Sequence, residues 1–134
     1  MSLIDNIKQS EGYKSTVYKC TEGYDTIGYG FAIKDLVLSE EISTMILIEK
    51  LDGIAERLSS HEFYISSPDE IRDVLVEMAY QLGVNGLLKF KKTLRLIGGG
   101  KYQEASVEML DSLWAKQTPN RAKHLSEVVL NAGT

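Results

Sequence analysis

The sequence offers little sulfur or histidine chemistry. A single cysteine, Cys20, excludes a disulfide bridge within the chain. The two histidines, His61 and His124, lie far apart, and no combination of cysteine and histidine has the spacing of a zinc site. We therefore expect no metal and no organic cofactor, and we expect both histidines to be ordinary surface or half-buried residues.

Long apolar runs and an excess of basic residues are also missing. No segment reaches the roughly 18 uninterrupted apolar residues of a membrane span, so we expect no membrane insertion. The formal net charge is −4, which argues against a nucleic-acid partner, because phosphate contacts need a basic face. Residues 1–5 contain no basic region before an apolar run, and we expect no classical signal peptide.

The patterns that are present predict helices around a small sheet. Apolar spacing predicts a short helix over residues 3–10 that ends at Gly12. Short runs rich in aromatic and β-branched residues predict three antiparallel strands around a turn at residues 21–23. These strands are expected at residues 17–20, 24–29 and 31–33.

Helices are expected over most of the remaining chain. Ser39 and the acids after it start a long amphipathic helix over residues 39–59. A polar and aromatic connector, residues 59–66, leads to a helix with Ser67 as its cap, Pro68 at its first position and Gly83 as its end. Two short helices within 84–97, one over 102–114 and a last one opened by Thr118 and Pro119 complete an α+β fold.

Three separate stretches carry the most specific signal. The first reads Glu-Gly at residues 11–12, Val-Tyr-Lys-Cys-Thr-Glu-Gly-Tyr at 17–24 and Thr-Ile-Gly-Tyr-Gly at 26–30. It resembles the active-site hairpin of the T-even phage lysozymes. Residues 78–83, Met-Ala-Tyr-Gln-Leu-Gly, resemble the core helix of that family's C-terminal lobe. Residues 114–122 resemble its Trp-x-x-Gln-Thr-Pro-x-Arg-Ala signature, so that the resemblance covers nearly the whole chain.

The resemblance implies a two-lobed lysozyme-like fold in one domain, residues 1–134. A sheet lobe, 13–38, would be joined by the long helix, 39–59, to a helical lobe, 60–134, on which helix 1–11 packs. The implied enzyme is a muramidase, which hydrolyses the β-1,4 bond between N-acetylmuramic acid and N-acetylglucosamine in bacterial peptidoglycan. We expect a monomer that is made in the cytoplasm of an infected host and acts on the cell wall in the periplasm. Release would occur through a partner pore (a holin), or the chain would act within a phage tail.

The resemblance also implies roles for individual residues. Glu11 would be the general acid, and Thr26 would hydrogen-bond the attacking water. Cys20 occupies the place of the family's catalytic aspartate. Arg121 would pair with Glu11 and tie the two lobes together, while Phe31 stands where the family usually has histidine. Four further residues fall where the family contacts saccharide: Ala32, Tyr80, Thr93 and Glu108.

The residues themselves are compatible with these roles. A general acid must keep its proton near neutral pH, and Glu11, between a helix end and a strand, is placed for partial burial. Arg121 lies in the first turn of the last helix, where the helix dipole disfavours a cation, so a carboxylate partner would explain it. Gly30 permits close backbone approach. Tyr18 either offers a face to a sugar ring or packs within the hairpin, and Trp114 is expected in the core.

Cys20 is the main departure from the family pattern. A carboxylate is ionised at pH 7, whereas a thiol with a pKa of roughly 8.5 is thiolate to only a few per cent. Cys20 then acts as a base, or its thiolate attacks the anomeric carbon and retains the configuration. A third route closes the sugar's own 6-hydroxyl on C1 after protonation by Glu11, as lytic transglycosylases do. In the last alternative Cys20 is a half-buried residue of an impaired enzyme.

The connection after Ile33 is a second departure. Only residues 34–38 precede the long helix, where the family usually has a longer loop and a further short helix, and we expect one side of the cleft to be more open. The alternatives to a muramidase are a catalytically impaired peptidoglycan-binding homologue, a lytic transglycosylase and a generic helical interaction domain.

Overall fold

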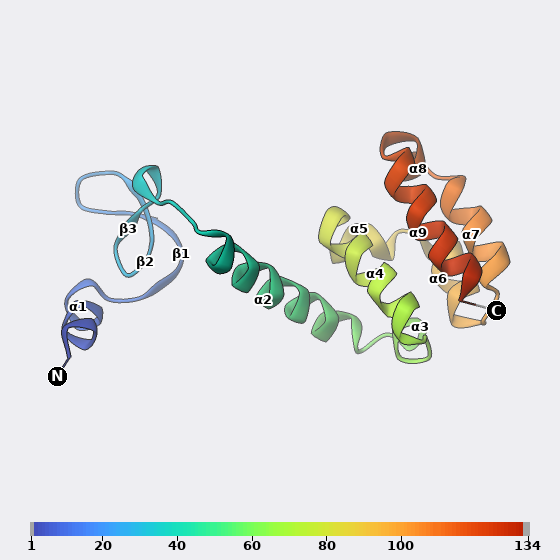
Figure 1. Ribbon diagram of the computed structural model, residues 1–134, viewed down its shortest axis with the longest axis horizontal. Helices are drawn as coiled ribbons and strands as arrows, with labels where there is room; N and C mark the ends of the chain where they lie inside the picture. Colours follow the sequence, from blue (N-terminus) through green and yellow to red (C-terminus); the bar gives the residue numbers. More distant parts are fainter. Residues whose placement is uncertain (1, 133–134) are drawn as a thin grey trace. The chain divides into compact units, whose positions relative to one another are not determined.

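The computed structural model describes residues 2–132, which are mostly helical with one small antiparallel sheet (Figure 1). The α+β class predicted from the sequence is therefore present. The chain forms two compact units, divided between Ser43 and Thr44. We call them the sheet unit and the helical unit, and the division falls inside helix α2 (Glu40–Leu58).

The sheet unit begins with helix α1 (Leu3–Glu11). Ser2 caps this helix, because its hydroxyl oxygen accepts a hydrogen bond from the backbone N–H of Asp5 at 3.1 Å. Gly12 follows with φ 70°, a conformation that favours glycine, and the helix ends there as predicted. The packing of this helix on the helical lobe stays a prediction.

Three short strands follow in the spatial order β1-β2-β3, and both neighbouring pairs are antiparallel. They are β1 (Lys14–Lys19), β2 (Asp25–Gly28) and β3 (Phe31–Ala32), and a 3-10 turn, η1 (Ile33–Asp35), comes after them. The register pairs Tyr18 with Thr26 and Thr26 with Ala32. The three predicted strands are thus present, but β1 starts earlier than expected and ends at Lys19, so that Cys20 lies in the turn.

The predicted long helix is α2. Ser39 caps it, since its Oγ accepts a hydrogen bond from the backbone N–H of Ile42 at 3.1 Å. Leu58, the last residue of the helix, is fully buried and belongs to the core of the helical unit.

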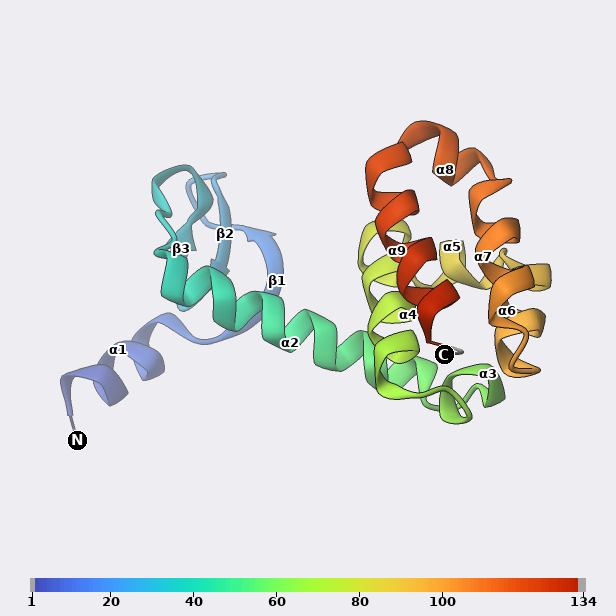
Figure 2. The same ribbon diagram turned by 45° about the vertical axis from the view of Figure 1, so that its right-hand side comes forward.

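The helical unit contains the hydrophobic core. Helix α9 packs against α4, α7 and α8, and α6 packs against α3 and α7 (Figure 2). Fully buried side chains include Leu75, Met78, Met109 and Val129. The helices after α2 are α3 (Glu62–Ile65), α4 (Asp69–Leu82), α5 (Val84–Leu88), α6 (Lys91–Gly98), α7 (Tyr102–Leu110), α8 (Leu113–Gln117) and α9 (Pro119–Asn131).

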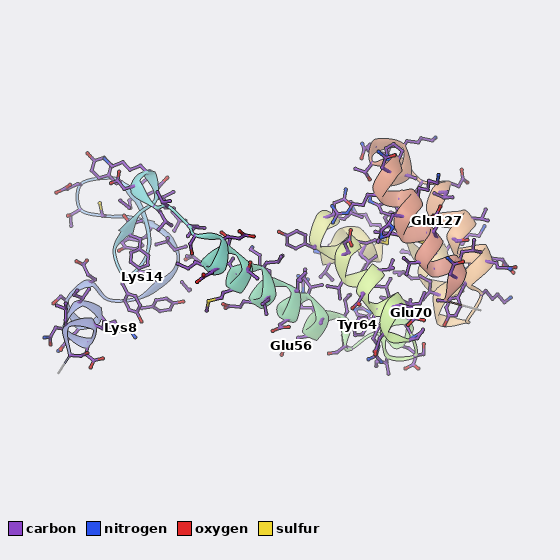
Figure 3. All side chains as sticks on the ribbon, in the orientation of Figure 1. Lys8, Lys14, Glu56, Tyr64, Glu70 and Glu127 are labelled. Atoms are coloured by element: carbon purple, nitrogen blue, oxygen red, sulfur yellow. The ribbon has the colours of Figure 1, made fainter. Side chains whose placement is uncertain are left out.

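The predicted connector over residues 59–66 contains a short helix, α3, that the sequence did not predict. Arg72 of α4 supports the end of this helix. Its Nε donates to the backbone oxygen of Tyr64 at 2.9 Å, and a terminal nitrogen donates to that of Ile65 at 2.5 Å. The guanidinium also lies 5.1 Å from the ring centroid of Tyr64, which is labelled in Figure 3.

The predicted start of α4 is wrong by one residue. The helix begins at Asp69, so that Pro68 is the capping position and not the first helical residue. Ser67 does not cap it, because its hydroxyl donates to the backbone oxygen of Phe63 at 2.6 Å. The predicted end at Gly83 is confirmed, with φ 79° at that glycine.

The single helix predicted over residues 102–114 is wrong, because α7 ends at Leu110 and α8 starts at Leu113. Ser112 separates them by capping α8, where its Oγ accepts from the backbone N–H of Ala115 at 3.1 Å. The expected core position of Trp114 is confirmed, since this side chain is 4% exposed. The two short helices expected within residues 84–97 and the helix opened by Pro119 are also present.

Candidate active site

Glu11 is the last residue of α1, and its carboxyl group lies against the backbone of Gly30. A methyl group built on Gly30 would lie 2.5 Å from Oε2 and 3.1 Å from Cδ of Glu11. Gly30 also has φ 78°, a backbone conformation that side chains rarely adopt. The close approach expected at Gly30 is therefore made by the candidate acid itself.

One face of the sheet carries three of the predicted site residues. Because Tyr18 pairs with Thr26 and Thr26 pairs with Ala32, the three side chains project from the same face across β1, β2 and β3. Thr26 in the centre is only 3% exposed, and its neighbours in this row are half-buried.

Cys20 lies immediately beyond β1, in a tight turn that leads to β2. Its backbone N–H donates to the oxygen of Tyr24 at 3.0 Å, and the N–H of Gly23 donates to the oxygen of Cys20 at 2.9 Å. Gly23 has φ 84°, which explains the glycine in this turn. The turn predicted over residues 21–23 is confirmed.

The surroundings of the Cys20 sulfur favour the thiolate. The backbone N–H of Tyr24 contributes most to lowering the pKa of the thiol, and the N–H of Glu22 contributes next. Burial of the sulfur raises the pKa, the Thr26 hydroxyl lowers it, and the Glu22 carboxylate raises it least. The net pKa lies below that of an ordinary thiol, so a larger fraction of Cys20 is ionised at neutral pH.

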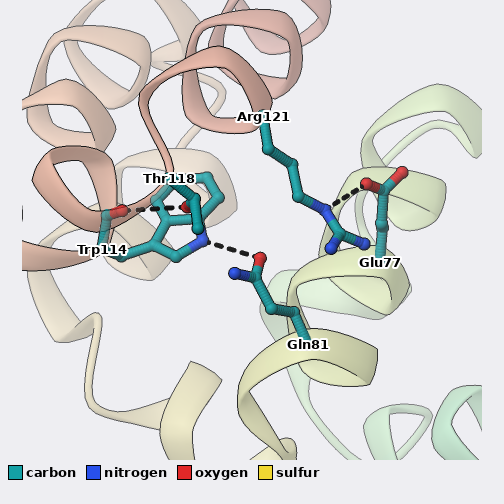
Figure 4. Close-up of polar contacts among 5 residues, drawn as sticks. All are labelled: Glu77, Gln81, Trp114, Thr118 and Arg121. Carbon is teal, nitrogen blue, oxygen red and sulfur yellow. Dashed lines mark hydrogen bonds and ion pairs between the residues drawn. The ribbon is translucent and has the colours of Figure 1, made fainter.

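Arg121 joins two helices of the helical unit. Its Nε donates to Oε2 of Glu77 at 2.7 Å, which links α9 to α4 (Figure 4). A carboxylate partner was expected for this cation because it lies in the first turn of α9. Glu77 is such a partner within the same unit, while the pairing of Arg121 with Glu11 stays a prediction.

Tyr80 and Arg121 line one pocket of the helical unit, about 350 Å³ in volume. The structure thus brings together two of the predicted site residues from α4 and α9. The rest of the lining is apolar on α2 and mixed on α4, and consists of Leu47, Leu51, Asp73, Val76 and Glu77.

Thr93 and Glu108 lie away from this pocket, on α6 and α7. Thr93 is 3% exposed, so its side chain is covered by the protein. Glu108 forms an ion pair with Lys92 at 3.3 Å and lines a separate groove of about 360 Å³. The structure does not bring these two residues to Tyr80 and Arg121, and their contact with saccharide stays a prediction.

Two functional groups were missed by the sequence analysis. Glu77 is 44 positions before Arg121 in the chain, and no local spacing signals a contact between them. The backbone N–H groups of Glu22 and Tyr24 carry no side-chain signal at all. Only the glycine at position 23 indicated a tight turn there.

No group of three or more His, Cys, Asp or Glu residues among residues 2–132 is placed to hold a metal ion. Within the same residues, no helix combines the length and the apolar character needed to cross a membrane.

A comparison with protein families matches the model of the phage lysozymes to residues 8–127. This match spans Glu11, the turn with Cys20, and Arg121. The chain belongs to the phage lysozyme family. It is therefore an enzyme of the lysozyme type, a glycoside hydrolase, and the lysozyme-like fold predicted from the sequence is confirmed.

The relatives of this phage lysozyme family member include two proteins of a eukaryote and one spike protein of a phage. It is 32% identical to Probable T4-type lysozyme 1 of Dictyostelium discoideum, with 96% of this chain and 93% of the relative aligned. It is 33% identical to Probable T4-type lysozyme 2 of that organism, with 95% and 92% aligned. The Pre-baseplate central spike protein Gp5 of Enterobacteria phage T4 is 30% identical, with 97% of this chain but 28% of that protein aligned.

The alignment with the first of these relatives also bears on chain length. It extends over 159 positions, although this chain has 134 residues. The relative therefore carries insertions relative to this chain.

Proposed function

We propose that this lysozyme is a muramidase that hydrolyses the β-1,4 bond between N-acetylmuramic acid and N-acetylglucosamine in bacterial peptidoglycan, with Glu11 as the general acid. The observation that carries the proposal is the contact of the Glu11 carboxyl group with Gly30. Gly30 lies two residues before Ala32, which is on the sheet face that also carries Thr26. A proton donor is thus held beside a surface with a potential base or nucleophile, Cys20, at its edge.

The proposed reaction needs one proton donor and one group that assists attack on the sugar. Glu11 gives its proton to the oxygen of the leaving sugar as the bond from C1 to that oxygen breaks. A water oxygen bonds to C1, and the Cys20 thiolate takes the proton that this water loses. The lowered pKa of Cys20 supports this assignment, because a base must be unprotonated at the start of the reaction.

The same thiolate is also placed to act as a nucleophile, which would give a covalent glycosyl–enzyme intermediate and retain the anomeric configuration. Product analysis separates the routes. Water attack assisted by Cys20 gives inverted hemiacetal ends, the covalent route gives retained ends, and closure by the 6-hydroxyl gives anhydro ends that are lighter by one water.

In the helical unit, we propose that Tyr80 contacts saccharide and that Arg121 supports the same site. Tyr80 and Arg121 share one pocket, and this juxtaposition supports a common role. Ala32 belongs to the sheet face of Thr26, which supports its assignment to substrate binding. We also propose that Thr93 and Glu108 contact saccharide. They would do so at α6 and α7, away from the pocket of Tyr80 and Arg121.

Digestion of purified peptidoglycan tests the proposal. Glu11→Gln should lose nearly all activity because glutamine has no proton to give at neutral pH, whereas Glu41→Gln, at an exposed acid in the first turn of α2, should stay close to wild type. Cys20→Ser should be strongly impaired and Cys20→Asp should be active. Full activity of Glu11→Gln would refute the assignment of the acid.

A peptidoglycan-binding homologue without catalysis is the second candidate, and the observation that favours it is a thiol at the family's aspartate position. It predicts a wild-type protein that binds peptidoglycan without releasing fragments, together with an active Cys20→Asp variant. Turbidity of a cell-wall suspension distinguishes this outcome from a working muramidase.

We further propose that the enzyme works as a monomer in host lysis, from the host cytoplasm to the cell wall, and that a holin releases it. Membership of the phage lysozyme family supports this setting, while the similarity to a phage spike protein supports the alternative of a tail-associated role. Expression in a bacterium with and without a pore-forming partner tests it, since lysis is expected only when the pore is present.

A further inference from the structure

Helix α2 carries a stripe of exposed side chains that is apolar near the start of the helix and acidic further along. The residues of this stripe recur at alternating intervals of three and four positions, which places them on one side of the helix: Ile42, Met45, Glu49, Asp52 and Glu56. We call them the α2 stripe. Ile42 is 48% exposed and Met45 is 68% exposed, and the three acids are exposed as well. The stripe is therefore accessible along its full length.

The α2 stripe is not the side of the helix that packs on the hydrophobic core. That side carries Leu58, which is fully buried, and Ile54, which is half-buried against the core. These two residues lie about half a turn around the helix from the stripe. A helix that serves one core needs a single apolar side, so Ile42 and Met45 form a second one. Glu56, at the acidic end of the stripe, is labelled in Figure 3.

The acidic part of the stripe has no cation at a suitable spacing within the helix. Lys50 and Arg57 are the cations of α2, and neither lies three or four positions from an acid of the stripe. Among residues 2–132, Glu49, Asp52 and Glu56 form no ion pair. Asp52 lies three positions after Glu49 and four before Glu56, at spacings where like charges repel. A cation supplied from outside the chain would therefore be attracted to this part of the stripe.

These charges decide which class of partner suits the stripe. A second copy aligned in parallel along it would set acids against acids, and an antiparallel copy would set apolar side chains against acids. A nucleic acid or an anionic lipid surface would be repelled, because both carry negative charge. A polypeptide that carries lysine or arginine beside apolar side chains avoids all of these conflicts.

We propose that the α2 stripe binds an amphipathic helix of another protein, with apolar side chains on Ile42 and Met45 and with lysine or arginine on the acids. Side chains repeated every three or four positions on a partner helix match the spacing of the stripe. Met45 adapts to the shape of a partner because its side chain is unbranched and flexible. None of the residues proposed for cleavage or saccharide contact belongs to the stripe, so this binding is additional to the proposed function.

Fluorescence anisotropy of labelled synthetic peptides tests the proposal on the unmutated protein without peptidoglycan. One helical peptide, as long as the stripe, carries leucines in the first half of its contact side and lysines in the second, and another carries them in the reverse order. Because the partner helix runs in one direction, one of the two should bind clearly more tightly. Its binding should weaken as the salt concentration rises, and replacing its lysines by glutamates should abolish it. Failure of both lysine peptides to bind, or equal binding of the glutamate peptide, overturns the proposal.

Substitutions in the protein show whether the tighter peptide binds at the stripe. Met45→Lys and Asp52→Lys should each weaken its binding by at least about tenfold, because they place a cation where the peptide needs an apolar or acidic side chain. The matched controls are Val107→Lys, at a residue of α7 that is 67% exposed, and Glu127→Lys, at an exposed acid of α9. Both controls should bind the peptide nearly as the wild type does. Equal binding by all four variants contradicts the proposal.

Two other occupants of the stripe have their own readouts. A dimer of the unmutated protein in sedimentation equilibrium that Met45→Lys dissociates would show that a second copy binds there. Loss of the fold in Met45→Lys by circular dichroism, with Val107→Lys still folded, would show that the chain itself covers Met45. Either result overturns the proposal. Peptide binding does not involve Glu11, so its failure and the failure of the muramidase proposal are distinguishable.

Discussion

Two conditions require glycine at position 30, a positive φ and the lack of room for a Cβ. At Gly83 only the positive φ applies. Gly30 has φ 78° and no room for a Cβ, because the Glu11 carboxyl group occupies that space. Gly83 has φ 79°, yet nothing lies within 4 Å of a Cβ built there. Backbone strain and steric conflict with the candidate acid can therefore be measured separately.

We predict that Gly30→Ala abolishes most activity on peptidoglycan and that Gly83→Ala does not. Both variants should lose stability, by about 1–3 kcal/mol, because alanine is strained at positive φ. Only the Cβ at position 30 displaces the Glu11 carboxyl group. Denaturant unfolding and a turbidity assay check the two effects, and equal activities of the two folded variants would contradict the placement of Glu11.

The lowered pKa of Cys20 predicts a dependence of stability on pH. A group with a folded-state pKa below its unfolded value adds stability that is present above the unfolded pKa and is lost as pH falls through the folded one. The wild type should therefore gain stability relative to Cys20→Ser as pH rises towards the ordinary thiol pKa of roughly 8.5, and the difference should level off above it. Urea unfolding of both proteins at a series of pH values measures this. A constant difference would exclude a stabilised thiolate.

Among the helices, the sequence predicted correctly those ends that are set by a neighbouring residue of the same helix. Helix α2 and its Ser39 cap follow from the local sequence, and so does the end of α4 at Gly83. The errors occur where a distant group decides the outcome. Helix α3 is supported by Arg72, which belongs to the next helix, and the serine expected to cap α4 instead bonds to Phe63. Spacing within a short window contains no information about such partners.

Arg72→Ala should destabilise the protein by about 2–3 kcal/mol, because it removes charge-assisted hydrogen bonds to two backbone oxygens at the end of α3. Arg95→Ala, at an exposed arginine of α6, should change stability by less than about 0.5 kcal/mol. Thermal unfolding followed by circular dichroism makes the comparison. Equal losses in the two variants would show that the contacts of Arg72 do not hold α3.

In the molecule as a whole, the sequence identified individual candidate site residues. It did not show which of them lie near one another in the folded chain. The resemblance singled out Glu11, Cys20 and Thr26, and the strand register explains why Thr26 shares a face with Ala32. The contact of Arg121 with Glu77 follows from the packing of α9 on α4, which only the folded chain brings together. All of the buried apolar side chains that the structure describes lie in the helical unit.

We predict that the slowest amide hydrogen exchange occurs in α4, α7 and α9, which carry Met78, Met109 and Val129 at 0% exposure. Exchange in β1 should be faster, since its residues other than Tyr18 are exposed. Exchange measured by NMR or by mass spectrometry of peptides tests this order. Protection in β1 equal to that in α4 would contradict it.

The burial of Trp114 has a practical consequence for studies of this chain. It is the single tryptophan, it is 4% exposed, and its Nε1 donates to Oε1 of Gln81 at 2.9 Å (Figure 4). Indole fluorescence therefore reports the entry of solvent into the helical unit alone, while the single cysteine belongs to the sheet unit. Each unit thus contains one native reporter, and the order in which the two units open can be followed in the natural sequence without an added probe.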